Sequence, residues 1–76
     1  MEEIYDDLTF EEAIVFTAAE DYKKALLLLK KNPESKFARR EVKELEDYFH
    51  SPDFEDLTNL NPDYLIRKIK EFIGGI

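Results

Sequence analysis

The stretch SPDFEDLTNLNPDYLIRKIKEF, residues 51–72, decides how the chain folds because it contains two helix starts close together. In each of them a residue with a side-chain oxygen stands directly before a proline: Ser51 before Pro52 and Asn61 before Pro62. The oxygen can cap a first helical turn, and proline fits the first helical position. We therefore predict a short helix and then a last helix, which turns back onto the helices that precede it.

Apolar side chains follow each of these starts at helical spacing. The short helix has Phe54 and Leu57, and Gly74 can end the last helix in the left-handed conformation. The predicted buried stripe of the last helix is Leu65, Ile66, Ile69, Phe72 and Ile73.

A long first helix is predicted between Thr9 and Asn32. Thr9 and Glu12 have the spacing of a capping box, in which each side chain binds the backbone N–H of the other residue. Pro33 ends the helix because the residue before a proline avoids the helical region. The apolar face is predicted to contain Phe10, Ile14, Ala18, Tyr22, Ala25, Leu28 and Leu29, widened by Val15, Ala19 and Leu26.

A second helix is predicted from about Glu34 to Phe49. Both Asn32 and Ser35 could cap it, and Pro33 at the first helical position favours Asn32. Its predicted apolar face contains Phe37, Ala38, Val42, Leu45, Tyr48 and Phe49.

No stretch shows sustained alternation of polar and apolar residues, so we expect no strands. The predicted fold class is all-α: a compact bundle of three main helices with an additional short helix between the second and third. Residues 9–76 form a single helical domain in this interpretation. Residues 1–8 form an acidic N-terminal segment, which could pack on the first helix.

The formal charge of −7 is divided into blocks along the chain. Residues 1–22 carry eight acids and no base, residues 23–43 carry eight bases and two acids, and residues 44–66 carry seven acids. An acidic total argues against general affinity for nucleic acid, because attraction to phosphates dominates such binding. Charge blocks of this size are also typical of solvated helical surfaces.

The residues do not form a recognisable catalytic pattern. The chain has no Cys and a single histidine, His50, which suits the C-terminal end of a helix better than a metal site. Both glycines are C-terminal, so there is no glycine-rich phosphate loop. We therefore expect neither an enzyme nor a cofactor or metal site.

Two apolar residues of the first helix fall on its predicted polar side. Phe16 and Leu27 are eleven positions apart, so they point the same way. They predict a second apolar surface, covered either by Ile4, Tyr5 and Leu8 of the N-terminal segment or by another chain.

The last two helices also have the outline of a helix-turn-helix. In that alternative the last helix would enter the major groove, with Arg67, Lys68 and Lys70 as DNA contacts. Asp63 at the start of this helix weakens the alternative because phosphates repel a carboxylate.

The region 48–72 resembles a group of short helical proteins encoded in phages and prophages of low-GC Gram-positive bacteria. The resemblance rests on an aromatic–Ser–x–x–Phe–x–x–Leu–Thr–x–Leu run that leads into Tyr-Leu-Ile-Arg-Lys. Here these residues are Phe49, Ser51, Phe54, Leu57, Thr58, Leu60, Tyr64, Leu65, Ile66, Arg67 and Lys68. The group has no established activity, so the resemblance implies a setting, phage DNA in a bacterial cytoplasm, rather than a mechanism.

Together these observations favour a non-catalytic phage-type accessory protein that binds another protein, which could be a second copy in a homodimer. One specific hypothesis is inhibition of a host or defence nucleic-acid-binding protein through acidic side chains, among them Glu2, Glu3, Asp6 and Asp7. The start of the chain lacks the basic and then apolar pattern of a signal peptide, and its apolar runs are short. We therefore expect a cytoplasmic protein without a membrane partner.

Overall fold

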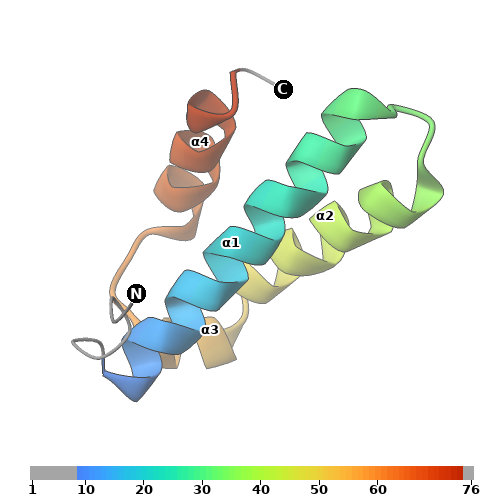
Figure 1. Cartoon of the computed structure of the whole chain (residues 1–76). Coiled ribbons are helices and arrows are strands. Elements are labelled where there is room, and N and C mark those ends of the chain that lie inside the picture. Colours follow the sequence, from blue (N-terminus) through green and yellow to red (C-terminus); the bar gives the residue numbers. More distant parts are fainter. Residues whose placement is uncertain (1–8, 75–76) are drawn as a thin grey trace.

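The computed structural model describes residues 9–74, which form four helices and no strand (Figure 1). The helices are α1 (Phe10–Lys31), α2 (Lys36–Phe49), α3 (Pro52–Leu57) and α4 (Pro62–Phe72). The predicted all-α class and the short helix between the second and third main helices are confirmed. The N-terminal segment, residues 1–8, lies outside the described residues.

The predicted helix starts are confirmed at three of the four helices. The Thr9 hydroxyl accepts the backbone N–H of Glu12, and the Glu12 carboxylate accepts that of Thr9, both at 3.1 Å. Ser51 and Asn61 cap α3 and α4, each by accepting one backbone N–H, from Phe54 and from Tyr64, and each is followed by a proline as the first helical residue. Gly74 follows α4 with a φ of +95°, a conformation that favours glycine.

Of the two caps predicted for α2, the favoured one, Asn32, is wrong, and the alternative, Ser35, is confirmed. The Ser35 hydroxyl accepts the backbone N–H of Ala38 at 3.1 Å. The Asn32 side chain accepts the N–H of Glu34, and its carbonyl accepts the N–H of Ser35. Asn32 thus closes the turn between the two helices, which leaves its side chain unable to cap α2.

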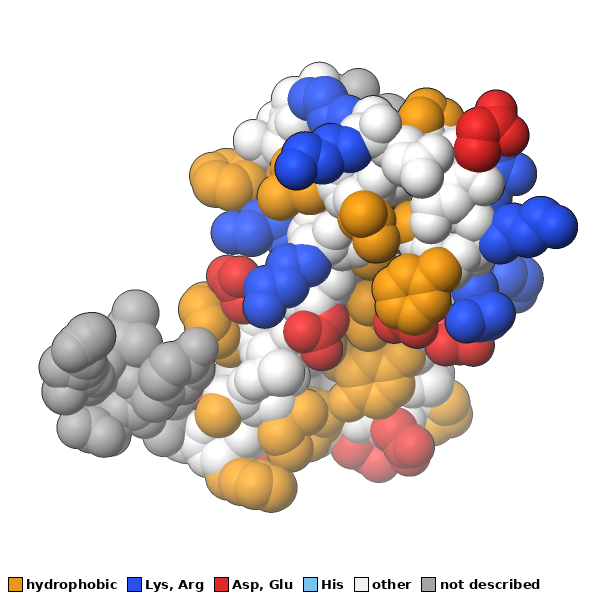
Figure 2. Space-filling model, turned by 45° about the vertical axis from the view of Figure 1, so that its right-hand side comes forward, with side chains coloured by type: hydrophobic (Ala, Val, Ile, Leu, Met, Phe, Trp, Pro, Cys, Tyr) orange, Lys and Arg blue, Asp and Glu red, His pale blue; other side chains and the backbone are white. Residues whose placement is uncertain are grey.

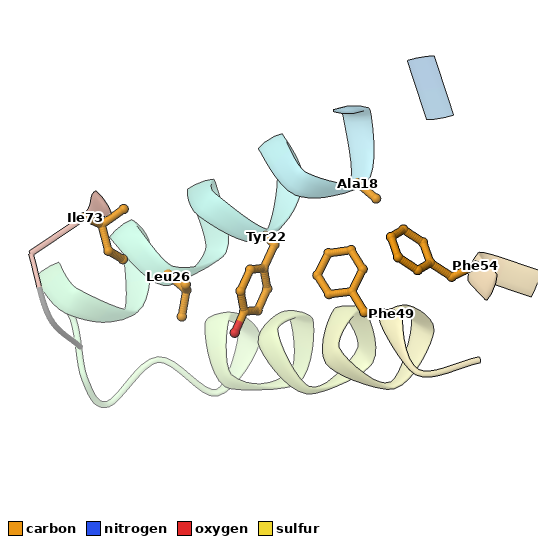
Figure 3. Close-up of a cluster of buried hydrophobic side chains, with 6 residues drawn as sticks. All are labelled: Ala18, Tyr22, Leu26, Phe49, Phe54 and Ile73. Carbon is orange, nitrogen blue, oxygen red and sulfur yellow. The ribbon is translucent and has the colours of Figure 1, made fainter. Parts of the chain in front are cut away.

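The other helices are arranged around α1. Helix α2 runs antiparallel to α1 on one side, α4 lies on the other side, and α3 packs against α1 and α2 near one end (Figure 1). The buried core lies between these elements and consists of Ala18, Tyr22, Leu26, Phe49, Phe54 and Ile73 (Figure 3). The Phe49 ring is central because it meets the Tyr22 ring at 5.4 Å and the Phe54 ring at 5.1 Å, both edge to face.

The buried face of α1 is rotated relative to the prediction. Phe10 and Leu28 were predicted to be buried but are 77% and 40% exposed, whereas Leu26, predicted at the margin, is buried. The position of α4 explains this rotation. Helix α4 lies beside the edge of α1 that carries Lys23 and Lys30: Lys23 lies over the Phe72 ring, and the Lys30 ammonium donates to the Ile73 carbonyl at the end of α4. Helix α1 is therefore covered from two sides, and one edge of its apolar face is left exposed.

Two further predictions of burial are wrong. Phe37 of α2 and Phe72 of α4 are both exposed. The Phe37 ring lies beside Arg40 and the Phe72 ring beside Lys23 of α1, both outside the buried core. Ile73, in contrast, is buried as predicted.

Replacing Phe49 with alanine should strongly lower the free energy of unfolding. Truncation of a buried phenylalanine costs about 3–5 kcal/mol, a large share of the stability of about 5–15 kcal/mol expected for a small domain. Circular dichroism during urea titration measures the loss. The matched control is Phe72→Ala, an exposed phenylalanine, for which the free energy of unfolding should change by less than about 1 kcal/mol.

Candidate protein-interaction surface

Folding gathers the charge blocks of the sequence into two halves of the molecule. Because α1 and α2 are antiparallel, the acidic first half of α1 lies beside the acidic second half of α2. We call this the acidic half; its described acids are Glu11, Glu12, Glu20, Asp21, Glu44, Glu46, Asp47, Asp53, Glu55 and Asp56. The basic half, around the turn between α1 and α2, carries Lys24, Lys30, Lys31, Lys36, Arg39 and Arg40. Figure 2 shows most blue side chains in its upper part and most red ones below them.

An apolar groove lies in the acidic half, between α1 and the segment that follows α3. It has a volume of ≈ 430 Å³, and we call it the Phe16 groove. Its lining residues are Glu12, Val15, Phe16, Ala19, Leu57, Thr58 and Leu60. Phe16 and Leu60 contribute the most exposed apolar side chains of this lining, at 36% and 45%. The groove thus offers apolar surface next to carboxylates.

Phe16 and Leu27 have different surroundings although both are exposed. Phe16 lies in the groove, whereas Leu27 is outside it, about 16 Å further along the helix axis. Between them, the Lys23 ammonium lies 5.2 Å from the centre of the Phe72 ring. The residues predicted to cover them, Ile4, Tyr5 and Leu8, lie outside the described residues. So do the four predicted acidic contacts, Glu2, Glu3, Asp6 and Asp7.

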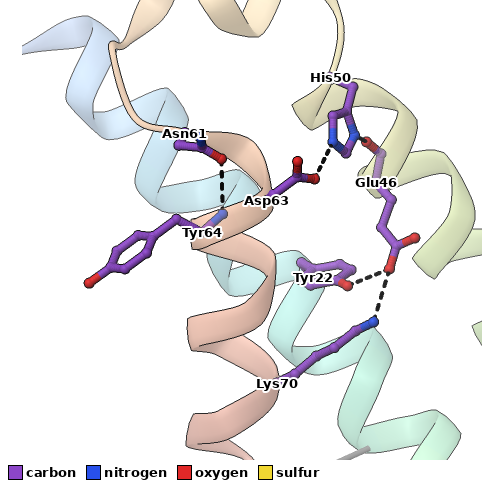
Figure 4. A network of polar contacts seen from close by, with 7 residues as sticks. All are labelled: Tyr22, Glu46, His50, Asn61, Asp63, Tyr64 and Lys70. Carbon is purple, nitrogen blue, oxygen red and sulfur yellow. Dashed lines mark hydrogen bonds and ion pairs between the residues drawn. The ribbon is translucent and has the colours of Figure 1, made fainter.

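A polar network joins α1, α2 and α4 next to the core (Figure 4). The buried Tyr22 hydroxyl donates a hydrogen bond of 2.5 Å to the Glu46 carboxylate. The Lys70 ammonium lies 3.8 Å from the same carboxylate oxygen. Burial, together with the neighbouring carboxylate, raises the pKa of Tyr22 far above its ordinary value. Tyr22 therefore stays a neutral hydrogen-bond donor, and the network holds helices in place rather than moving protons.

The Tyr22→Phe variant should be less stable than the wild type by about 1.5–3 kcal/mol, because a hydrogen bond to a partly buried carboxylate is lost. The core packing of the ring is kept, so the helix content should not change. Urea unfolding followed by circular dichroism measures the difference. Tyr64→Phe, which removes the hydroxyl of an exposed tyrosine, is the control and should lie within about 0.5 kcal/mol of the wild type.

His50 connects the end of α2 to the start of α4. Its Nδ1 lies 2.8 Å from the Glu46 carbonyl oxygen, and its Nε2 lies 2.8 Å from a carboxylate oxygen of Asp63 (Figure 4). Both partners accept hydrogen bonds, so only the doubly protonated, cationic ring can donate to both. The hydrogen bond to Asp63 is the main cause that raises the pKa of His50, and the Glu46 carbonyl adds to it.

The contact between His50 and Asp63 should make stability depend on pH. A pKa that is higher in the folded than in the unfolded chain adds stability below the unfolded value of about 6.5, and this gain is lost as the pH rises through the folded pKa. The stability difference between wild type and Asp63→Asn should therefore shrink as the pH rises from below about 6.5 through the raised pKa of His50. In a His50→Gln background the same difference should stay constant, and a shrinking difference there would contradict the assignment.

The three cations predicted as DNA contacts lie on two sides of α4. Arg67 and Lys68 are exposed, and each lies over the Tyr64 ring and near Glu71. Lys70 instead faces Glu46 in the network beside the core. The helix-turn-helix alternative therefore stays a prediction, with two of its three cations on one exposed side.

Several residues that organise these sites were not found from the sequence. Glu46 was overlooked because a glutamate among many acids carries no signal of its own, and Asp63 was read only as a weakness for DNA binding. Within residues 9–74, no three His, Asp or Glu side chains are grouped as metal ligands. None of the described helices combines the length and the apolar character required to cross a membrane.

Comparisons with models of known protein families, with curated proteins and with solved structures gave no match. The resemblance to phage and prophage proteins therefore stays a prediction, and the function has to be argued from the geometry of this chain.

Proposed function

We propose that this chain is a non-catalytic binding protein whose partner is another protein with a basic and partly apolar surface. In this proposal the three longer helices act as one bundle that displays the acidic half. The Phe16 groove would receive an apolar side chain of the partner, while the surrounding carboxylates attract its cations.

The observation that supports this proposal is the Phe16 groove within the acidic half. Between Thr9 and Tyr22 the chain has four acids and no base, and between Glu44 and Thr58 it has six acids and no Lys or Arg. An exposed apolar surface bordered by charge of a single sign is typical of a binding site for a partner of opposite charge.

A nucleic-acid-binding protein is one class of partner that has such a surface. Its DNA-binding groove is basic, and a dense group of carboxylates can occupy it in place of phosphates. An accessory protein that inhibits a host or defence protein in this way agrees with the phage setting implied by the resemblance. It requires neither a cofactor nor a reactive pocket in this chain.

A pair of labelled synthetic helical peptides tests the proposal. In one peptide leucines line one face and lysines the other, and in the second peptide glutamates replace the lysines. Fluorescence anisotropy should show that the protein binds the lysine peptide, and that added salt weakens binding because it screens the charges. The glutamate peptide should not bind.

Variants of the groove show where the peptide binds. Phe16→Asp and Leu60→Asp should weaken binding of the lysine peptide at least tenfold, because each places a charge in the apolar lining. Leu27→Asp is the matched control outside the groove and should bind like the wild type. Equal binding of both peptides, or no effect of either groove variant, would contradict the proposal.

A further inference from the structure

A second apolar surface lies on the opposite edge of α1, on the side of the α1–α2 pair that faces away from α4. Two grooves follow each other along this side, with volumes of ≈ 420 Å³ and ≈ 330 Å³, and both are lined by residues of α1 and α2 alone. We call this surface the open α1–α2 face. Its main apolar residues are Phe10, Ile14, Leu28, Phe37, Leu45 and Tyr48.

The open α1–α2 face is a continuous stripe and not a set of scattered residues. Phe10 and Leu28 are eighteen positions apart, which is about five helical turns, so they point the same way. Phe37 and Tyr48 on α2 are eleven positions apart and also share a direction. Figure 2 views the molecule from this side and shows orange side chains from its lower to its upper part. Apolar surface of this extent marks an interaction site.

Charges of both signs lie along this face. At the Phe37 end, the Arg40 guanidinium lies 5.8 Å from the centre of the Phe37 ring. At the Tyr48 end, Glu44 precedes Tyr48 by one helical turn. Asp21 and Lys24 line the middle of the face. Glu41 also lines the groove at the Phe37 end, so that end carries charges of both signs. The face as a whole runs from the acidic half, at Phe10 and Tyr48, to the basic half, at Leu28 and Phe37.

We propose that the open α1–α2 face binds a second copy of this chain in an antiparallel, two-fold symmetric dimer. A two-fold axis through the middle of the face places the acidic half of each copy beside the basic half of the other. A parallel pair would put charges of the same sign together, which costs free energy.

This dimer differs from the one that the sequence suggested through Phe16 and Leu27. The Phe16 groove lies on the other edge of α1, so it stays accessible in the antiparallel dimer. The two proposals thus use different apolar surfaces, and either can fail without the other.

Two adjacent leucines provide a matched test. Leu28 lies on the open face and is 40% exposed, whereas Leu27 lies outside it and is 41% exposed. Sedimentation equilibrium should give the mass of two chains for the wild type and for Leu27→Asp, but of one chain for Leu28→Asp. Phe37→Asp on α2 should also be a monomer, and circular dichroism should show that the helix content of each variant is kept.

The result that overturns the proposal is a monomeric wild type at all concentrations tested. Dissociation by Leu27→Asp but not by Leu28→Asp or Phe37→Asp would also overturn it, because it would assign the contact to the other side of α1. If Leu28→Asp loses its helix content, the mass of Phe37→Asp in sedimentation equilibrium decides whether the open α1–α2 face forms the dimer.

Cross-linking tests the antiparallel orientation. The chain has no Cys, so a single introduced Cys carries the only thiol. A mixture of Phe10→Cys and Leu28→Cys chains, treated with a short bis-maleimide, should give cross-linked dimers, because the two positions face each other. Each variant alone should not, since identical positions are then about 27 Å apart along the helix. Efficient cross-linking of either variant alone would overturn the antiparallel arrangement.

Discussion

The contacts of Tyr22 hold the three longer helices together. Its ring packs edge to face against Phe49 of α2, and its hydroxyl donates to Glu46 on the same helix. Glu46 in turn attracts Lys70 of α4. A single side chain of α1 therefore reaches α2 directly and α4 through one carboxylate. The chain has no Cys, and a domain of this size buries a smaller share of its surface than a larger one. Tyr22 combines apolar packing and hydrogen bonding in one side chain, and this combination positions the helices.

The position of α1 between α2 and α4 explains where apolar surface is left exposed. Helix α4 covers one edge of α1, next to Lys23 and Lys30, and leaves the edge with Phe10 and Leu28 open. The open α1–α2 face lies on the edge that α4 does not cover, and the Phe16 groove lies on the same edge of α1 as α4 but nearer the start of α1. The groove is lined by one acid, Glu12, and the open face has charges of both signs. We therefore assign them to different partners, a basic protein and a second copy of the chain.

Most of the secondary structure could be predicted from the sequence because its signals are local. Thr9, Ser51 and Asn61 each bind an N–H within three residues, so sequence spacing alone identifies these caps. The sequence left two caps open for α2 because Asn32 and Ser35 both satisfy the local rule. The favoured one, Asn32, was wrong because its side chain makes another bond in the turn between the helices. The candidate sites could be predicted only in part. The exposure of Phe16 follows from helical periodicity, but its neighbours Leu57 and Leu60 come from a segment distant in sequence.

The sequence by itself determined that the chain is helical, where three of its helices begin, and that its charges come in blocks. These properties depend on residues within one or two helical turns of each other, so they can be predicted from neighbouring residues in the sequence. Only the tertiary structure decided which edge of α1 is buried, that Glu46 accepts a hydrogen bond from Tyr22 and that Asp63 accepts one from His50. Such contacts depend on how whole helices pack, and an amphipathic pattern states that a face will be covered but not which helix covers it.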